Sequence, residues 1–424
     1  MNNLPIIEYH KHPAFSGLQY VDDLGDEGTL RLTAEIDVAF FRIQSGGVLS
    51  LDLLHDVFER DIASGMRKLR DELTKSERVH GPMANYVTSA IDKAAGYLYA
   101  QLEFDMWKQT FTAVQPNAVT TKKLEHLQHD GFFRFQSDLH LAEKIWRATE
   151  YERASLRSRA QQRPWAHCVQ SLHSSSQAVR LVRRKLESDG ILALASAYLG
   201  CEMEWFYCAL DFSHDQQRWY RDCYADVGLP TSKTVYMHLD ADIQMVKAML
   251  YLGDVSDEQG PFRYVRGSSC WARSPSILSI HKGFDTVETE VFEMEPDQLD
   301  YTLGYYRPRF KLPEHRQYLM NLPALLRGST HFGDDVLDDS ALSSLLLKDE
   351  VVFTGPAGTL VLFDGSKGIH RGSQVTRGER WAVQIALRAV RQQKNIFRTT
   401  LETMTQAARY RAHILKRRLK GPFG

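Results

Sequence analysis

The sequence is poor in cysteine, in charge of one sign and in long apolar runs. Its five cysteines, at positions 168, 201, 208, 223 and 270, are odd in number and form no CxxC pair. This argues against a disulfide framework and against a thiolate zinc site, and it favours a reducing compartment. The 52 Lys and Arg residues balance 53 Asp and Glu residues. The basic excess that is typical of nucleic-acid binders is therefore missing, and we expect no nucleic-acid partner.

The apolar runs are also short. The most apolar one, residues 191–199, is too short to cross a bilayer. The opening MNNLPIIEYHKHPAF has no basic region followed by an apolar stretch, so we expect no secretory signal and a cytoplasmic protein. The 424 residues are enough for two or three structural units, and 43% hydrophobic with 25% charged residues is ordinary for a globular protein.

Residues 1–180 are predicted to be mainly helical. Apolar residues recur near helical spacing over 49–66, which predicts an amphipathic helix, and 92–111 and 139–159 show similar patterns. A further short apolar helix is expected at 191–199, where Gly200 would end it.

The pattern changes to short β-prone runs after Gly200. Seven such runs, each bounded by Gly, Pro or Asp, lie at 202–212, 234–240, 245–252, 262–266, 350–354, 358–363 and 381–390. Several short strands separated by turn signals predict a sandwich or barrel, and with the preceding helices this gives an α+β fold class.

Two other segments complete the predicted organisation. Residues 283–345, rich in Tyr, Arg and Asp, interrupt the strands and are interpreted as an insertion. Residues 395–419 have a helical pattern with a basic end, so a C-terminal helix is expected. The predicted units are therefore a helical region at 1–180, a β-rich core at 181–392 and a basic helix at 393–424.

The strongest local signal for chemistry is His238-Leu239-Asp240 at the end of a predicted strand. Of sixteen histidines, His238 alone is followed two positions later by an acidic residue. Residues two apart in a strand point to the same side, so this imidazole and this carboxylate can face one point. A second imidazole would complete a set that leaves coordination positions open and suits non-haem Fe(II). The best candidate for it is His370, which follows a predicted strand.

Three segments resemble the phytanoyl-CoA dioxygenase family in their order and spacing. They are the HLD tripeptide, the strand KAMLYLGDV that begins at Lys247, and the segment GPFRYVRGSS that begins at Gly260. His370-Arg-Gly and Arg380 resemble the distal histidine and the cosubstrate arginine of that family. The resemblance covers about residues 185–392 and says little about 1–180 or 283–345.

This resemblance implies a double-stranded β-helix of the jelly-roll or cupin-like type. It also implies Fe(II), 2-oxoglutarate and O2, with His238, Asp240 and His370 as catalytic metal ligands. Arg380 would bind the far carboxylate of 2-oxoglutarate because guanidinium groups pair with carboxylates in bidentate geometry. Arg377 is a rival for that role, but its distance from His370 matches the family's usual spacing less well. Because Asp240 is retained, we expect hydroxylation rather than halogenation.

The sequence also offers other candidate residues, and most of them have more than one interpretation. The family commonly has a hydroxyl residue where this chain has Gly372, so Ser373 is the candidate for a second contact to the cosubstrate. Lys247 could touch the cosubstrate, or it could be an outward, solvated lysine. Tyr236 should face the same side as His238, where it could line the pocket or simply fill the core. His331 and Asp334 fall in the insertion, which could cover the mouth of the barrel and select the substrate, but a surface loop is the preferred interpretation.

Two further functions stay open at this point. The barrel could be a catalytically silent binding or sensing module, or a metal-dependent cupin-like enzyme that uses no 2-oxoglutarate. The expected partner is a small-molecule substrate, such as a natural product, an amino-acid derivative or a lipid. The sequence does not predict which of these it is, nor the oligomeric state.

Overall fold

We describe the protein from a computed structural model. It divides into two compact units, Met1–Ala389 and Val390–Gly424. The described residues are 11, 15–19, 27–47, 50–75, 79, 81–109, 118–162, 168–217, 234, 237–240, 244–291, 316–317, 320–323, 326–333 and 336–390. All described helices and strands belong to the first unit, and the predicted basic helix at 393–424 lies outside the described residues.

Five helices and one π-helical turn form a separate helical cluster. They are α1 (Glu27–Ser45), α2 (Leu51–Phe58), the π turn (Glu59–Ala63), α3 (Ser64–Lys75), α4 (Pro82–Gln109) and α10 (Pro275–Val291). The apolar faces of these helices share one buried cluster, which includes Ile36, Leu54, Leu98 and Phe284. Helix α10 begins before the predicted insertion at 283–345, runs into it and packs against α4.

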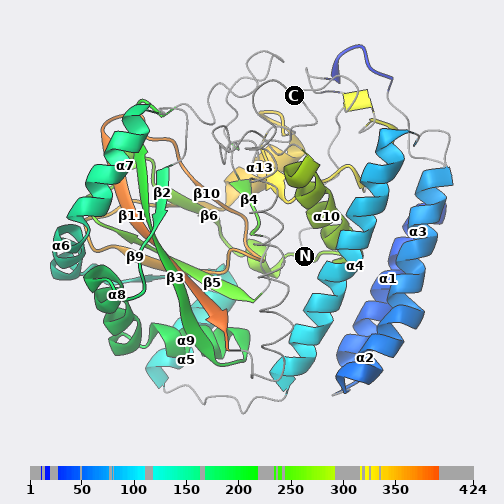
Figure 1. Ribbon diagram of the computed structural model, residues 1–424, viewed down its shortest axis with the longest axis horizontal. Coiled ribbons are helices and arrows are strands. Elements are labelled where there is room, and N and C mark those ends of the chain that lie inside the picture. The colour runs from blue at the N-terminus through cyan, green and yellow to red at the C-terminus, as the bar shows by residue number, and fades with distance from the viewer. Residues whose placement is uncertain are drawn as a thin grey trace, which may run out of the picture. The chain divides into compact units, whose positions relative to one another are not determined.

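The core is a pair of antiparallel sheets (Figure 1). One sheet has the order β1-β9-β5-β11-β3-β2, and the other has the order β7-β4-β10-β6-β8. The strands are β1 (Phe132–Phe135), β2 (Cys168–Ser171), β3 (Met203–His214), β4 (Met237–His238), β5 (Met245–Tyr251), β6 (Phe262–Val265), β7 (His331–Phe332), β8 (Glu350–Phe353), β9 (Leu360–Phe363), β10 (His370–Gly372) and β11 (Glu379–Ala389).

Eight of these strands have jelly-roll topology. Strands β3, β5, β9 and β11 lie in one sheet and β4, β6, β8 and β10 in the other, so that the chain crosses repeatedly between the sheets. This arrangement confirms the expected double-stranded β-helix, and it contains all seven of the predicted strand runs. Strand β7, from the predicted insertion, extends the five-stranded sheet at its β4 edge.

Two strands come from the region predicted to be mainly helical. Strand β1 pairs with β9, and β2 pairs with β3, so they form the two edges of the six-stranded sheet. Each has only four residues, FFRF and CVQS, which is too short for a clear alternating pattern. The N-terminal half of the chain therefore contributes directly to the sheet.

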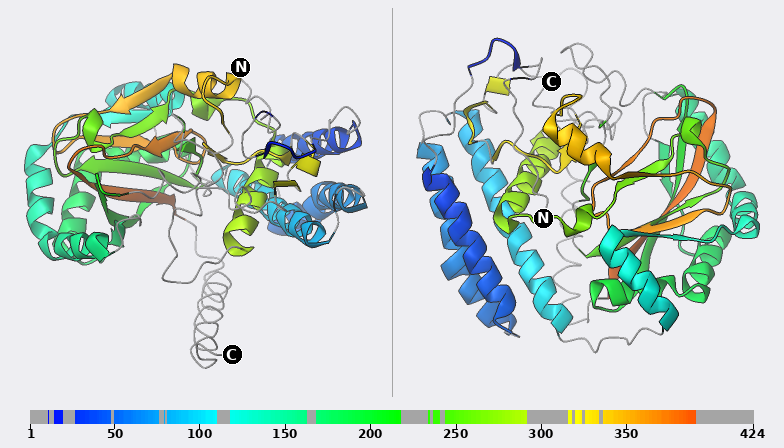
Figure 2. Two further views of the ribbon diagram at one scale, coloured as in Figure 1. Left: turned by 90° about the horizontal axis from the view of Figure 1, so that it is seen from above. Right: turned by 180° about the vertical axis from the view of Figure 1, so that it is seen from behind.

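Helices cover the outer face of the six-stranded sheet. They are α5 (Ala118–Asp130), α6 (Leu139–Ala148), α7 (Glu150–Gln162), α8 (Gln177–Ser188) and α9 (Ile191–Leu199), and Figure 2 shows this side of the sheet from two further directions. Outward residues such as Leu210 and Val383 pack against Ile145, Val182 and Leu194 of these helices. Burial of apolar surface between these helices and the sheet is the dominant contribution to the stability of this layer.

The inner face of the six-stranded sheet carries polar side chains as well as apolar ones. Residues along a strand alternate between faces, and on β3 the outward Leu210 and Phe212 alternate with Asp211 and Ser213. The interior also holds an aromatic cluster that includes Tyr251, Phe262 and Phe363. The candidate site is built on this interior. No helix among the described residues is long and apolar enough to cross a membrane.

Candidate metal centre

His238 and His370 face each other across neighbouring strands of the five-stranded sheet. Strand β4 pairs with β10 so that His238 is directly opposite His370, and residues directly opposite in this way project from the same face of a sheet. The two ring centroids are 4.3 Å apart. Both side chains are buried, and Asp240 joins them two residues after His238.

The three side chains meet at one point. Nε2 of His238 lies 3.7 Å from Oδ1 of Asp240, and Nε2 of His370 lies 3.7 Å from Oδ2 of the same carboxylate. The three candidate ligand atoms all lie within 4.8 Å of one another. Among the described residues, this is the only group of three or more His, Cys, Asp or Glu side chains close enough to hold a metal ion. Two imidazoles and one carboxylate with open positions fit Fe(II).

The surroundings fix the orientation of the ligands. Nδ1 of His370 donates to the Gly368 carbonyl at 3.0 Å, which leaves Nε2 as the atom available to a metal. The backbone N–H of Asp240 donates to the Gly365 carbonyl at 2.7 Å. A Cβ atom at residue 365 would lie 1.9 Å from Oδ2 of Asp240, so only glycine fits beside this carboxylate.

A lysine from the opposite sheet completes the centre. Nζ of Lys247, on β5, donates to Oδ1 of Asp240 at 2.7 Å. Lys247 therefore faces the interior, which excludes the reading of an outward, solvated lysine. Burial opposes ionisation of Asp240, but Lys247 and the two histidines outweigh it and hold the pKa of this carboxyl well below its usual range. Burial and the neighbouring His238 lower the pKa of His370 to about 3, so this ring is neutral at pH 7.

Arg380 lies on the inner face of the six-stranded sheet and is almost fully buried. Its guanidinium donates to the Gly260 carbonyl and, through Nη2, to Oγ of Ser213 at 3.1 Å. Nη2 also lies 3.7 Å from Oδ1 of Asp211. Nε of Arg380 is buried and has no hydrogen-bond partner among the described residues. A buried guanidinium with an unused donor is suited to bind a carboxylate.

Arg377 is placed differently. Its side chain is 79% exposed and lies 3.8 Å from Glu258 in a surface turn. Of the two arginines that the sequence left as candidates, only Arg380 therefore faces the barrel interior.

The structure places the other predicted cosubstrate contacts elsewhere or does not describe them. Oγ of Ser373 accepts a hydrogen bond from Nε of Arg263 at 2.6 Å, and Arg263 in turn contacts Glu350. The hydroxyl of Ser373 is thus engaged by Arg263, whereas the hydroxyl that contacts Arg380 is that of Ser213. Ser213 was not among the residues predicted from the sequence, where the alternation along β3 could have shown only that it faces the interior. Tyr236 lies outside the described residues.

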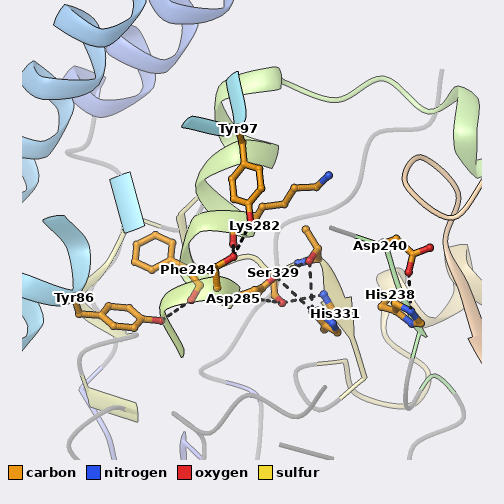
Figure 3. A network of polar contacts seen from close by, with 11 residues as sticks. Tyr86, Tyr97, His238, Asp240, Lys282, Phe284, Asp285, Ser329 and His331 are labelled. Carbon is orange, nitrogen blue, oxygen red and sulfur yellow. Dashed lines mark hydrogen bonds and ion pairs between the residues drawn. The ribbon is translucent and has the colours of Figure 1, made fainter. Parts of the chain in front are cut away.

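His331 lies beside the metal centre rather than in a remote surface loop (Figure 3). Strand β7 pairs His331 with His238, and the two rings stack with centroids 5.6 Å apart and planes at 7°. Nδ1 of His331 lies 3.5 Å from Asp285 of α10, whose carboxylate also accepts from Oγ of Ser329 at 2.7 Å. A polar network therefore links the helical cluster to the strand next to His238. Asp334 lies outside the described residues.

Comparisons with known proteins find likeness in structure but not in sequence. No family model and no curated protein matches the chain. One similar solved structure is the non-heme α-ketoglutarate-dependent epimerase SnoN from nogalamycin biosynthesis, which is 13% identical, with 64% of this chain and 84% of that chain covered and a TM-score of 0.34.

Two others are similar to the same degree. The non-heme monooxygenase ThoJ, solved as a nickel complex, is 14% identical, with 63% and 76% covered and a TM-score of 0.33. EctD from S. alaskensis, solved with 2-oxoglutarate and 5-hydroxyectoine, is 13% identical, with 66% and 79% covered and a TM-score of 0.35. These values are low, and the fold assignment rests on the strand order and register described above.

Proposed function

We propose that this chain is an Fe(II)- and 2-oxoglutarate-dependent dioxygenase that hydroxylates an unactivated C–H bond of a small molecule and releases succinate and CO2. The observation that carries the proposal is the convergence of His238, Asp240 and His370 inside a jelly roll whose other sheet buries an inward-facing arginine. The sequence resemblance to the phytanoyl-CoA dioxygenase family supports the same activity. A natural product, an amino-acid derivative or a lipid is the expected substrate class.

Two of the three proposed metal ligands are prepared for a metal by their surroundings. The neutral His370 presents Nε2 because the Gly368 carbonyl holds its Nδ1–H. Asp240 is ionised at neutral pH, so a divalent cation does not have to displace a proton from it. When bound, iron with 2-oxoglutarate and O2 supplies the oxidising chemistry, and the protein supplies the geometry and a water-poor site.

Arg380 is the proposed partner of the far carboxylate of 2-oxoglutarate. Its unused Nε–H and its position on the inner face favour this role over Arg377. Ser213 replaces Ser373 as the proposed hydroxyl at this end of the site, because its Oγ already contacts Arg380 at 3.1 Å. Asp211 accepts from Nε2 of Gln384 at 2.6 Å and lies 3.7 Å from the guanidinium, which it would help to orient.

Lys247 is proposed to act on both the metal ligand and the cosubstrate. In this structure its ammonium donates to Asp240 and keeps that carboxylate charged. An anionic cosubstrate beside the metal would give the same ammonium a second carboxylate partner. Tyr236, which the sequence places two residues before His238, is retained as a proposed wall of the same pocket.

The test is an anaerobic titration with Fe(II) and then 2-oxoglutarate, followed by the weak visible absorption band of the chelated cosubstrate. We expect the band in the native protein and not in His238→Ala. Arg380→Gln should bind Fe(II) normally. Its affinity for 2-oxoglutarate should be about 10- to 150-fold lower, because the substitution removes charge-assisted hydrogen bonds. The matched control is Arg377→Gln, which changes an exposed arginine three residues away and should leave the affinity unchanged.

The alternatives predict other results. Bound iron without any band, or an Arg380→Gln variant with native 2-oxoglutarate affinity, would favour the cupin-like enzyme that uses no 2-oxoglutarate. No bound iron at all would favour the silent binding module.

A further inference from the structure

One loop contacts two of the three metal ligands. Residues 364–369 connect β9 to β10 and lead directly into His370. The Gly365 carbonyl accepts from the backbone N–H of Asp240 at 2.7 Å, and the Gly368 carbonyl accepts from Nδ1 of His370 at 3.0 Å. The path of this loop therefore sets the positions of both ligands, which come from different parts of the chain.

The side chain of Asp364 holds the loop together from within. Its Oδ1 accepts from the backbone N–H and Oγ of Ser366, at 3.0 and 2.8 Å, and from the backbone N–H of Lys367 at 3.0 Å. Its Oδ2 accepts from the hydroxyl of Tyr198, on α9, at 2.8 Å. Asp364 is fully buried, and both of its oxygens are engaged by donors within the protein. It binds the turn, not the metal.

The loop packs closely against its neighbours at two glycines. A Cβ atom at residue 365 would lie 1.9 Å from Oδ2 of Asp240, and one at residue 368 would lie 1.5 Å from the hydroxyl of Tyr264. That hydroxyl also donates to the Asp364 carbonyl at 3.0 Å. A small displacement of the loop must therefore move Asp240, His370 or both.

We propose that Asp364 is a positioning residue for the metal centre, anchored by Tyr198. Its carboxylate fixes the conformation of the 364–369 loop, and two carbonyls of this loop orient Asp240 and His370 through hydrogen bonds. This inference rests on the proposed metal site. Replacing Asp364 by Asn substitutes an NH2 group for one acceptor oxygen, so either the turn N–H groups or the Tyr198 hydroxyl lose their acceptor. The ligands would remain in the sequence but lose their alignment.

The experiment measures binding of Co(II) to the full chain by titration, together with the Co(II) d–d spectrum, which reports ligand geometry. Loss of a partner behind a metal ligand typically weakens metal binding by about 10- to 100-fold, and this is expected for Asp364→Asn. Tyr198→Phe removes only one hydrogen bond to Oδ2 and should weaken binding by about 2- to 10-fold. Both variants should alter the spectrum of the bound ion.

The matched control is Asp138→Asn. Asp138 is also an aspartate that binds a backbone N–H, that of Leu141 at 2.9 Å, and a side chain, Nζ of Lys185 at 2.8 Å, but it caps α6 on the helix-covered side of the sheet. This variant should lower the melting temperature without changing Co(II) affinity or the spectrum.

The outcomes separate the inference from the proposed function. If the native protein does not bind Co(II) at all, the metal site itself is wrong. If the native protein binds it and Asp364→Asn binds equally well with an unchanged spectrum, the positioning role is wrong. Should Asp364→Asn fail to fold, Tyr198→Phe decides: native affinity with an unchanged spectrum overturns the role, and weakened binding with an altered spectrum supports it.

Discussion

The two sheets of the jelly roll differ in the length of their strands and in what they carry. The six-stranded sheet contains β3 and β11, with 12 and 11 residues, and its outer face is covered by five helices. No strand of the five-stranded sheet exceeds 4 residues, yet β4 and β10 carry His238 and His370. Long paired strands with an apolar face provide stability, whereas short strands end close to loops. We therefore expect stability to depend mainly on the six-stranded sheet, called here the stable wall, and metal binding on the five-stranded sheet, called here the metal wall.

The largest expected effect comes from removing a metal ligand on the metal wall. His370→Ala should weaken Fe(II) or Co(II) binding by more than about 100-fold, beyond the usual cost of losing an outer partner of a ligand. The free energy of unfolding of the apoprotein should change less than in the core variant described next. Metal titration and urea unfolding of the same preparation would test this. Native metal affinity in this variant would show that His370 is not a ligand.

The second prediction addresses the opposite wall. Leu210 is fully buried beneath the helices that cover β3. Leu210→Ala should lower the free energy of unfolding by about 2–5 kcal/mol because it leaves a cavity. The folded fraction should still bind Co(II) with native affinity. Val38→Ala, at a position 68% exposed on α1, is the control and should change stability by less than about 0.5 kcal/mol. If Leu210→Ala also lowers the affinity for Co(II), then stability and metal binding do not depend on different sheets.

The third prediction concerns Lys247, which reaches from the stable wall to the metal wall. Lys247→Met removes a cation 2.7 Å from a metal-binding carboxylate. Without this competitor we expect about tenfold tighter binding of Co(II) in the absence of 2-oxoglutarate, or about 1.4 kcal/mol. The affinity for 2-oxoglutarate should fall. Lys185→Met breaks a similar pair, with Asp138 at 2.8 Å, and should change neither affinity. Weaker Co(II) binding would mean that Lys247 orients Asp240 more than it repels the metal.

The smallest expected effect is a dependence of apoprotein stability on pH. The pKa of His370 is about 3 in the folded protein and about 6.5 in an unfolded chain. Between these values the unfolded chain takes up a proton that the folded protein excludes, so stability falls as the pH falls below 6.5. The slope from this one group is at most about 1.4 kcal/mol per pH unit.

Between pH 6.5 and pH 5 the contribution of His370 has to be found by comparing variants, because burial also lowers the pKa of His214. Asp240 also loses its stabilising contribution in acid, but only below the usual carboxyl pKa of 3.8. Urea unfolding of the apoprotein across the window should therefore give a smaller pH slope for His370→Asn than for the native chain. The exposed His173 provides the control variant, His173→Asn, which should keep the native slope. Equal slopes in all three proteins would contradict the buried, neutral state of His370.

The sequence was sufficient to predict the local parts of the fold and of the site. His238 and Asp240 were predictable because a spacing of two in a strand fixes a shared side. His370 was a candidate because it follows a predicted strand, whereas the role of Arg380 came only from the resemblance. Their approach to His238 depends on pairing between strands far apart in the chain. All seven predicted strand runs contain strands, since turn residues bound each of them.

The parts that sequence could not predict depend on long-range geometry. Ser213 and Asp211 were not selected, because neither alternation nor composition says that β3 runs beside β11. Asp364 looks like an ordinary turn residue until the loop is seen against Asp240. Strands β1 and β2 were missed inside the helical region, because their four residues acquire β structure only by pairing with β9 and β3.

The pairing of β1 with β9 also has a consequence for synthesis of the chain. The register places Phe132 opposite Phe363, and the central strand β11 follows only at Glu379–Ala389. Ribosomes add roughly 5–20 residues per second, so β1 waits on the order of ten seconds or more for its partner. The FFRF segment lacks its partner strand during that interval. We therefore expect nascent chains stopped before Glu379 to bind chaperones and to resist proteases poorly, and protection to arise late, when β11 leaves the exit tunnel.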